Sequence, residues 1–159
     1  MPDTRSATAA DAALISAHRR AMFAEVHTLD DAILTAIERR SVEWTERMIR
    51  EGKYFGWIIA ETGRPVASAG LLILDWPPHP FDPEGERRGY LLNVYVEPAC
   101  RRRGLARELV KRCLTEAHSR GIRVVSLHSS DAARPIYESF SFRRTNEMLH
   151  VDGPEKKRS

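Results

Sequence analysis

Apolar residues recur at helical spacing along the first third of the chain. One stripe predicts a helix that begins at a capping signature, in which the acid Asp11 follows Thr8 by three residues. After a polar break over residues 27–30, a second stripe predicts another helix, which Gly52 ends. The two stripes are Leu14, Ile15, His18, Met22 and Val26, and Leu34, Ile37, Trp44 and Met48. A short extended segment over residues 3–7 precedes them.

The pattern then changes to strands. Residues 54–61 and 66–74 flank a turn containing glycine and proline, which predicts a hairpin. The following segment, residues 76–83, holds four prolines, so it cannot form regular structure. We expect it to be a semi-rigid loop that lies over one end of the sheet.

A βαβ unit follows the proline-rich loop. Residues 90–96 are almost continuously apolar, as expected for a strand buried on both faces. A helical pattern over residues 104–120 ends at Gly121, and residues 124–128 form the next strand. Because a crossover helix joins these two strands, we expect them to be parallel.

The C-terminal part predicts a short helix over residues 131–140, a last strand over 144–150 and a tail over 151–159. The whole pattern indicates an α+β fold with one domain over residues 1–150, and 159 residues are enough to bury a core.

Positive charge is concentrated in one segment. The net charge of the chain is +3, whereas residues 101–123 carry seven arginines and one lysine against two glutamates. A local basic patch on a mildly acidic body favours a compact polyanionic ligand, although a solvated basic helix face is the alternative. The segment contains no aromatic residue for base stacking, which argues against a nucleic-acid groove.

The remaining composition sets limits on other kinds of site. Cys100 and Cys113 have no CxxC spacing; we expect a surface thiol at the first and a core residue at the second. The six histidines are scattered, so no metal is expected. No apolar stretch reaches the length of a membrane span, so we expect a cytoplasmic protein without a membrane partner.

The most informative stretch joins the buried strand to the helix after it. It contains four arginines, two small residues and one leucine: Arg101, Arg102, Arg103, Gly104, Leu105, Ala106 and Arg107. A helix start offers backbone N–H groups without intrahelical partners and the positive end of the helix dipole. Small residues at 104 and 106 allow a ligand to approach the backbone. The turn therefore predicts a phosphate or pyrophosphate pocket.

The spacing Arg101-x-x-Gly104-x-Ala106 resembles the pyrophosphate arm of the GCN5-related N-acetyltransferases, the GNAT family. The resemblance implies a central mixed, mostly antiparallel sheet of six to seven strands, flanked by about four helices, with a parallel pair that splays apart for the cofactor. It implies acetyl-CoA as co-substrate, held by all seven residues of the turn. It also implies a β-bulge around Val94, Tyr95 and Val96, whose free backbone groups polarise the thioester carbonyl.

A second signature lies after the next strand. The family pattern is Asn-x-x-x-Ala-x-x-x-Tyr and then Gly-Phe. The matches are Ala133, Tyr137 and Phe142, with Ser129 in the asparagine position and Ser141 in the glycine position. The resemblance makes Tyr137 the general acid that protonates the departing thiolate. Ser129 would bind the pantetheine arm and Arg134 a phosphate or the pantetheine region, and Ser141 would occupy a strained left-handed position.

The proton acceptor for the incoming amine is not readable from the residues. The candidates are Glu25, His27, Asn93, Tyr95 and His128. We prefer Glu25, because the family commonly shapes its acceptor site where the two N-terminal helices join. A direct transfer in a ternary complex needs no enzyme nucleophile, and no Cys/His or Ser/His pair suggests one.

These observations predict an acetyl-CoA-dependent N-acetyltransferase that acts on a primary amine of a small molecule or peptide. A non-catalytic coenzyme A-binding regulatory module is the main alternative, and a small nucleic-acid-binding domain is disfavoured. A homodimer stays open, and the identity of the amine does too.

Overall fold

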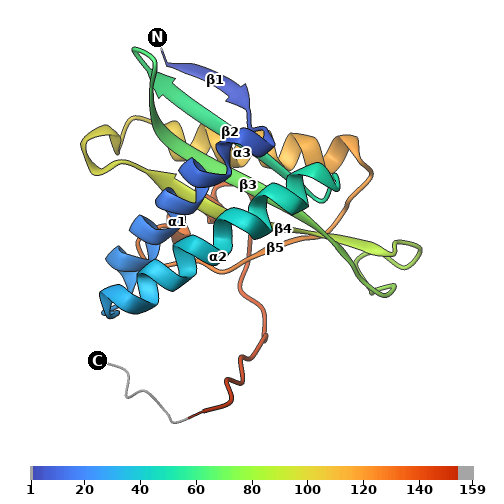
Figure 1. Cartoon of the computed structure of the whole chain (residues 1–159). Coiled ribbons are helices and arrows are strands. Elements are labelled where there is room, and N and C mark those ends of the chain that lie inside the picture. Colours follow the sequence, from blue (N-terminus) through green and yellow to red (C-terminus); the bar gives the residue numbers. More distant parts are fainter. Residues whose placement is uncertain (1, 154–159) are drawn as a thin grey trace.

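The computed structural model describes residues 2–153. Its strands are β1 (Asp3–Ser6), β2 (Tyr54–Glu61), β3 (Arg64–Asp75), β4 (Arg87–Val96) and β5 (Val125–Leu127). Its α-helices are α1 (Ala12–Val26), α2 (Asp31–Arg50), α3 (Leu105–Ser119) and α4 (Arg134–Glu138), and short 3-10 turns cover Ala9–Asp11 and Pro98–Cys100. Figure 1 shows these elements in sequence colours.

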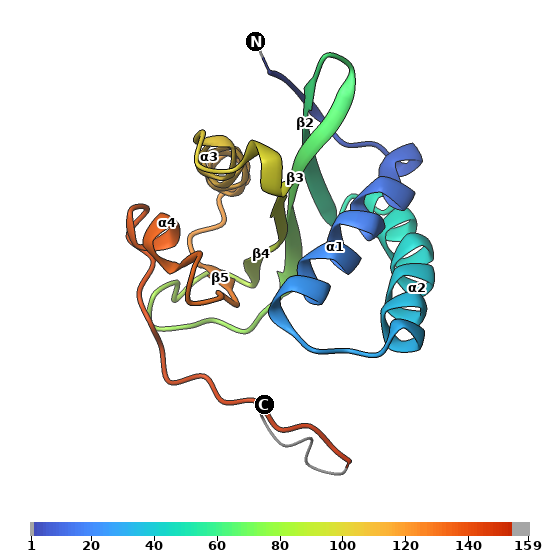
Figure 2. The ribbon, with the colours of Figure 1, turned by 90° about the vertical axis from the view of Figure 1, so that its left-hand side faces the viewer.

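The strands form one sheet in the order β1-β2-β3-β4-β5. The first four are antiparallel neighbours, and β4 and β5 are parallel. Helices α1 and α2 cover one face of the sheet, and α3 and α4 lie on the other (Figure 2). The predicted mixed, mostly antiparallel sheet with helices on both faces and one parallel pair is therefore confirmed.

The predicted strand count is wrong. The sheet described here has five strands, and residues 144–150, predicted as the last strand, form none. Strand formation needs a partner for the backbone groups, and this segment has no neighbouring strand in the described chain. The predicted tail over residues 151–159 lies outside the described residues from 154 onward.

The α3 face of the sheet carries a continuous apolar core. The core contains the buried face of helix α3 and, from β2, β3 and β4, inward-facing residues such as Ile59, Leu71 and Leu91. Cys113 is fully buried in this cluster, as predicted, whereas the expected surface thiol at Cys100 is wrong: Cys100 is also buried there. The 3-10 turn before the arginine segment folds Cys100 inward, its sulfur 3.9 Å from a Glu61 carboxylate oxygen.

The α1/α2 face differs, because its buried layer mixes apolar and polar side chains. The buried polar residues of the described chain are Ser16, His18, Thr45, Ser68 and Asn93. All of them belong to α1 or α2, or lie on β3 and β4 and contact α1. Gly70 of β3 also faces this side, where a Cβ would lie 2.1 Å from the Tyr54 hydroxyl, so only glycine fits.

Candidate active site

The parallel strands separate near their carboxyl ends. The pairing of β4 with β5 covers only Gly89 to Leu91, opposite Val125 to Leu127, although β4 continues to Val96. Beyond Leu91 the two strands no longer pair, and at this end β4 leads through one short 3-10 turn into the arginine turn. Ligands of open sheets bind where parallel strands end and diverge, so the splay, the turn and α3 define the candidate site.

A β-bulge interrupts β4 where it leaves β5. Ser68 of β3 lies opposite Tyr95, but Gly70 lies opposite Leu92, so β4 has one extra residue between these pairs. Asn93 takes up this irregularity with φ of +57°, a left-handed conformation that asparagine tolerates better than most residues. A bulge leaves backbone groups outside the ladder, as the predicted polarising group requires.

The arginine turn exposes a run of backbone donors. The backbone N–H groups of residues 102–107 donate to no group within residues 2–153, whereas those of Arg101 and Glu108 are bonded. Gly104 is the N-cap of α3 with φ of +81°, and nothing lies within 4 Å of the position its Cβ would occupy. Free amides at a helix start, with open space over a glycine, fit a pyrophosphate.

Two arginines of the turn are already paired with carboxylates. Arg101 binds both carboxylate oxygens of Glu25 at 2.6 and 2.7 Å, and its Nε donates to the Val96 carbonyl at 2.9 Å. Arg103 pairs with Glu61 at 2.6 Å. These two cations therefore tie the turn to α1 and β2, and the backbone amides are the donors left available.

The other two arginines of the turn differ from this pair. Arg107 donates to the Ser139 hydroxyl at 2.6 Å and lies over the Phe140 ring at 4.8 Å from its centroid. Arg102 is exposed, with φ of +60°. The buried Leu105 and half-buried Ala106 anchor the first turn of α3 to the core.

Tyr137 of α4 reaches the apolar cluster on the α3 face. Its ring packs edge-on against Phe142, 5.9 Å between centroids. Burial raises the pKa of Tyr137 to about 12, with a smaller contribution from Cys113, so its hydroxyl keeps its proton. Its oxygen forms no hydrogen bond within residues 2–153, yet it is not completely closed off from solvent.

Two predicted cofactor contacts point into their own loop. Ser129 donates its hydroxyl to the Ser130 carbonyl at 2.6 Å, and Arg134 pairs with Asp131. Ser129 follows the end of β5 by two residues and Arg134 begins α4, as the sequence placed them, but their polar groups are engaged locally. Ser141 has φ of +66°, so the predicted left-handed position is confirmed.

The residues around the bulge face both sides of the sheet. Val94 and Val96 pack toward the α3 core. The Tyr95 ring lies on the α1 side, 4.8 Å from the His18 ring and 5.9 Å from the Arg101 guanidinium carbon. The bulge therefore contacts the apolar core and the polar α1 face together.

The structure gives the candidate proton acceptors very different surroundings. Glu25 holds Arg101 with both oxygens, so its lone pairs are engaged. His27 and His128 are exposed, and Asn93 carries an amide, which is not basic. Burial raises the pKa of Tyr95, the nearby Glu25 adds to this, and the phenol keeps its proton.

His18, one position of the predicted apolar stripe of α1, lies against two residues beside the bulge, Ser68 and Tyr95. Its Nδ1 is 2.7 Å from the Ser68 hydroxyl oxygen, opposite Tyr95 in the sheet. Burial lowers its pKa, and Glu97 opposes the shift only in part, so the imidazole is neutral at pH 7. Its Nε2 forms no hydrogen bond within residues 2–153 and is not completely closed off from solvent. The sequence around His18 gives no sign of this role, because its hydrogen-bond partner Ser68 is 50 residues away.

A second set of polar contacts holds Asn93 at the bulge. Arg19 donates to the Asn93 side-chain carbonyl at 2.7 Å, and the Asn93 amide donates to the Tyr54 hydroxyl at 3.2 Å. Both amide groups of Asn93 are thereby used within the fold. Arg19 and Tyr54 thus hold the left-handed Asn93 in place through its side chain.

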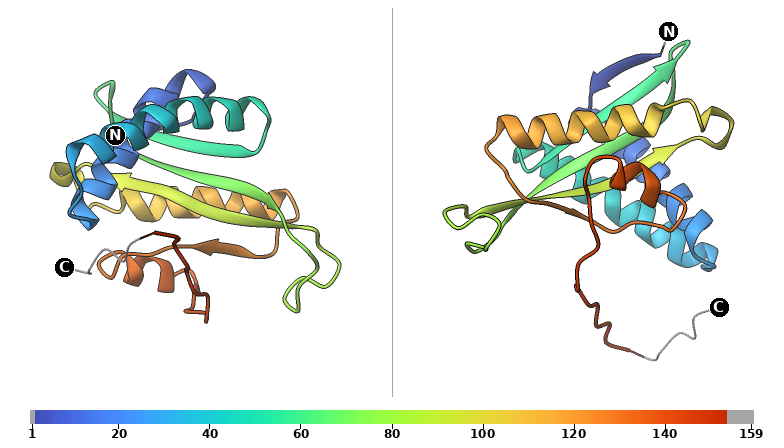
Figure 3. Two further views of the ribbon diagram at one scale, coloured as in Figure 1. Left: turned by 60° about the horizontal axis from the view of Figure 1, so that its bottom comes forward. Right: turned by 180° about the vertical axis from the view of Figure 1, so that it is seen from behind.

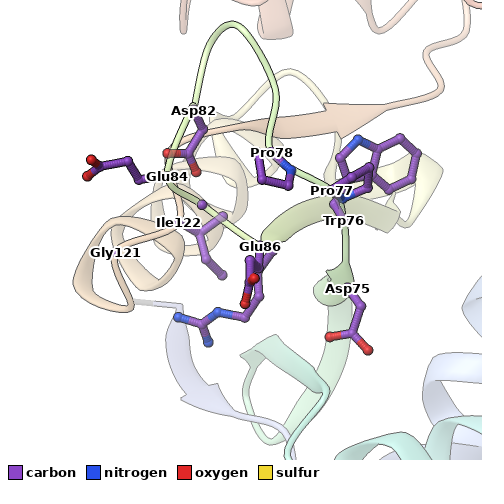
Figure 4. A pocket seen from close by; sticks show the side chains of 11 residues that line it. Asp75, Trp76, Pro77, Pro78, Asp82, Glu84, Glu86, Gly121 and Ile122 are labelled. Atoms are coloured by element: carbon purple, nitrogen blue, oxygen red, sulfur yellow. The ribbon is translucent and has the colours of Figure 1, made fainter.

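The proline-rich loop lies at the other end of the sheet. There it borders a hollow of about 790 Å³ between the start of β4 and the end of α3. Figure 4 shows the carboxylates of Asp75, Asp82, Glu84 and Glu86 around it. The loop joins β3 to β4 at the end of the sheet away from Gly104 and projects beyond the strands (Figure 1).

Two further searches of the described chain gave negative results. Within residues 2–153, no three His, Cys, Asp or Glu side chains gather as a metal site would require. None of the helices there combines the length and the apolar character needed to cross a membrane.

Comparison with known proteins identifies the family. The model of the acetyltransferase (GNAT) family matches residues 17–142, so the chain belongs to this family. A crystal structure of a GCN5-related N-acetyltransferase from Ralstonia eutropha JMP134 is 36% identical, with a TM-score of 0.89 over 95% of this chain and 98% of that one. A predicted acetyltransferase from Clostridium acetobutylicum, crystallised with acetyl-CoA, is 26% identical, with a TM-score of 0.85 and 96% of each chain covered.

A match to a curated relative covers a smaller part of both chains. The chain is 33% identical over 91 residues to a glucosamine 6-phosphate N-acetyltransferase from Trypanosoma brucei brucei. The match spans 57% of this chain and 59% of that enzyme.

Proposed function

We propose that the chain is an acetyl-CoA-dependent N-acetyltransferase that acetylates a primary amine of a small molecule or peptide by direct transfer in a ternary complex. One arrangement carries the proposal. The bulge at Asn93 interrupts β4, the free amides of residues 102–107 follow its end, and Tyr137 belongs to the same apolar cluster as Val96 and Leu105.

The turn would hold the pyrophosphate of the cofactor. Its free backbone N–H groups and the dipole of α3 attract an anion, and Arg102 and Arg107 add positive charge at the surface. Ser129 and Arg134 would serve the pantetheine region by exchanging their local partners for it. Acetyl-CoA supplies the activated acetyl group when bound.

The bulge would stabilise the developing negative charge. Backbone donors near Asn93 and Val94 lie outside the regular ladder and are held in place by the packed sheet. Preorganised donors of this kind contribute strongly to acyl transfer.

Tyr137 would deliver the proton that the leaving thiolate needs. A thiol has a pKa near 8.5, and the raised pKa of Tyr137, about 12, keeps the phenol protonated until negative charge develops beside it. The apolar surroundings strengthen that interaction.

His18 would take the proton from the attacking amine. Its pKa is lowered by burial, so the neutral form is present at pH 7. If Nδ1–H donates to Ser68, Nε2 carries the free lone pair that can accept a proton. Glu25, the preferred candidate from sequence, would instead position Arg101 at the rim of the site.

Glucosamine 6-phosphate, the substrate in the name of the curated relative, is one amine to test. The alternative function, a coenzyme A-binding module without catalysis, predicts binding of acetyl-CoA with no acetyl transfer to any amine. The accessible Tyr137 hydroxyl favours the enzyme.

The test measures coenzyme A release across a panel of amines: glucosamine 6-phosphate, an aminoglycoside, free amino acids and a peptide with a free N-terminus. Calorimetry measures acetyl-CoA binding in parallel. We expect Tyr137→Phe to lower kcat by about 10²–10⁴-fold with little change in acetyl-CoA affinity. Tyr90→Phe, the same change at a half-buried tyrosine of β4, is the control. Unchanged turnover in Tyr137→Phe would disprove the acid role, and absent acetyl-CoA binding would disprove the function.

The same assay separates the two proton acceptors. His18→Gln should lower kcat and remove the acidic limb of its pH profile, while Glu25→Gln should mainly raise KM. The reverse pattern would restore Glu25 as the base.

A further inference from the structure

Arg19 is a half-buried cation between α1 and β4. Helix α1 lies on the face of the sheet opposite α3 (Figure 3). The Nη1 of Arg19 donates to the Asn93 side-chain carbonyl at 2.7 Å, and within residues 2–153 its guanidinium forms no other hydrogen bond and no ion pair. Because a guanidinium has five N–H donors, most of them remain available to a ligand.

The carboxylates near the bulge are already bound to other arginines. Glu25 pairs with Arg101 at 2.6 Å, and Glu97 pairs with Arg64 at 2.5 Å. Each of these pairs neutralises itself within the fold. Among the described residues at the bulge, Arg19 is therefore the cation whose charge lacks a counter-ion.

This charge is costly to keep where it lies. Burial lowers the pKa of Arg19, and the phenols of Tyr54 and Tyr90 offset this only in part. Glu147 acts on Tyr90 but is not among the groups that act on Arg19. By contrast, the pKa of Arg103 is raised by the carboxylate that it binds. A half-buried cation without an anion loses hydration that nothing in the fold replaces, and an anionic group of a ligand would replace it.

The guanidinium is held close to the proposed reaction centre. Its central carbon lies 4.7 Å from the centroid of the Phe23 ring, which packs it against α1. Through Asn93 it is one side chain away from the bulge of β4. His18, the proposed base, precedes it in α1 and lies beside the same strand, 4.8 Å from the Tyr95 ring. An amine that reaches His18 at the bulge would therefore place a neighbouring group near Arg19.

We propose that Arg19 binds an anionic group of the acceptor, so that the preferred substrates are amines with an anion close to the amino group. A carboxylate on the carbon that carries the amine suits this short separation, because a guanidinium binds a carboxylate through two parallel N–H···O bonds. The inference rests on the proposed function, since it concerns the acceptor of that reaction. It makes Arg19 a specificity-determining residue, and α-amino acids are the first class to test.

The kinetic test compares matched acceptors that differ in the anion: amino acids with their carboxamides, and glucosamine 6-phosphate with glucosamine. We expect wild type to prefer the anionic member of at least one pair by about 10–100-fold in kcat/KM, mainly through KM. Arg19→Gln should lower this ratio to near 1, and Arg19→Lys should retain part of it. Because both members of a pair meet the same enzyme, the ratio is independent of the folded fraction and of changes at Asn93.

Arg20→Gln is the matched control. Arg20 is the next residue of α1, and its charge is already paired with Asp31 and Glu38. The change removes the same charge and should leave the ratio unchanged. Equal or better turnover of the neutral acceptors by wild type overturns the inference. An unchanged ratio in Arg19→Gln, or an equal fall in both variants, does so too.

A binding measurement separates this inference from the proposed activity. Calorimetry of N-acetyl amino acids and their amides, with coenzyme A present, reports on the acceptor site without catalysis. Binding that needs the carboxylate and is lost in Arg19→Gln supports the inference even where no amine is acetylated, and the proposed activity alone then fails. Acetylation of amines without any preference for an anion overturns the inference and leaves the activity standing. The absence of both turnover and anion-dependent binding overturns both.

Discussion

The two faces of the sheet are built in opposite ways. The α3 face is a continuous apolar cluster, in which Leu109, Val110 and Cys113 are fully buried. The α1/α2 face places a buried imidazole, an amide and a hydroxyl against the same strands, in His18, Asn93 and Ser68. Both faces meet at the bulge of β4, where Val94 packs toward one and Tyr95 toward the other.

The difference shows which face stabilises the fold and which is adapted for chemistry. Apolar burial adds stability in proportion to the area removed from water. A buried polar group must first recover its lost hydrogen bonds with water, so it rarely adds much. A fold retains such groups where they hold a special geometry, and here they hold the left-handed Asn93 and orient His18. The α3 face would then hold the donor end of the reaction, and the α1 face the proton acceptor.

The largest effect is expected on the apolar face. Leu109→Ala should lower the free energy of unfolding by about 3 kcal/mol, because Leu109 is fully buried and its removal leaves a cavity. Urea denaturation measures this loss. Leu114→Ala, the same change on a half-buried position of α3, should cost clearly less. Equal losses would mean that the α3 core is not tightly packed.

The polar network should come second. Asn93→Gly keeps the left-handed backbone but leaves the Tyr54 hydroxyl and Arg19 without their partner, at a cost of about 2 kcal/mol. Asn93→Ala adds backbone strain at φ of +57° and should cost more. Unfolding curves of both variants give the difference. A stability order in which alanine exceeds glycine would show that the bulge relaxes when the amide is lost.

The pH dependence of stability should report the buried imidazole. The pKa of His18 is lowered in the folded state, so the unfolded chain binds a proton first, near its ordinary value of 6.5. Stability should therefore fall as pH decreases below about 6.5, with a slope of at most about 1.4 kcal/mol per pH unit from this group. The comparison is between wild type and His18→Gln from pH 8 to pH 5, with the exposed His128→Gln as control. Parallel curves for wild type and His18→Gln would contradict a buried neutral imidazole.

The smallest effect concerns a turn beside the α3 core. Ser141 has φ of +66°, so Ser141→Gly should stabilise the chain by about 1 kcal/mol, seen as a higher Tm. Ser41→Gly, in the middle of α2 where the backbone is helical, should destabilise it by about 0.5–1 kcal/mol instead. A loss of stability in Ser141→Gly would mean that the flexibility of the unfolded glycine chain outweighs the relieved strain.

Much of the site could be predicted from short stretches of sequence. The strand, arginine turn and helix from Tyr90 to Arg120 follow one another without a break, so hydrophobic period and turn chemistry predict them and they lie where expected. The left-handed conformations of Gly104 and Ser141 also follow from their places in local motifs. Tyr137 lies one helical turn beyond Ala133, and that spacing was enough to place it.

Other features could not be predicted, because they join distant residues. Glu25 and Arg101 are 76 residues apart, and only the packed helix and turn show that the preferred base is bound to an arginine. The partner of His18 is 50 residues away. The strand predicted over residues 144–150 has a suitable pattern, but pairing depends on a neighbouring edge that no local pattern reports.

The sequence by itself determined most of the elements, the arginine turn and the family, because periodicity, capping and turn dihedrals are properties of neighbouring residues. The tertiary structure alone decided which polar groups meet beside the bulge, which arginines remain free, and which strand is left without a partner. These outcomes depend on burial and on contacts between segments, and such interactions exist only once the chain has folded.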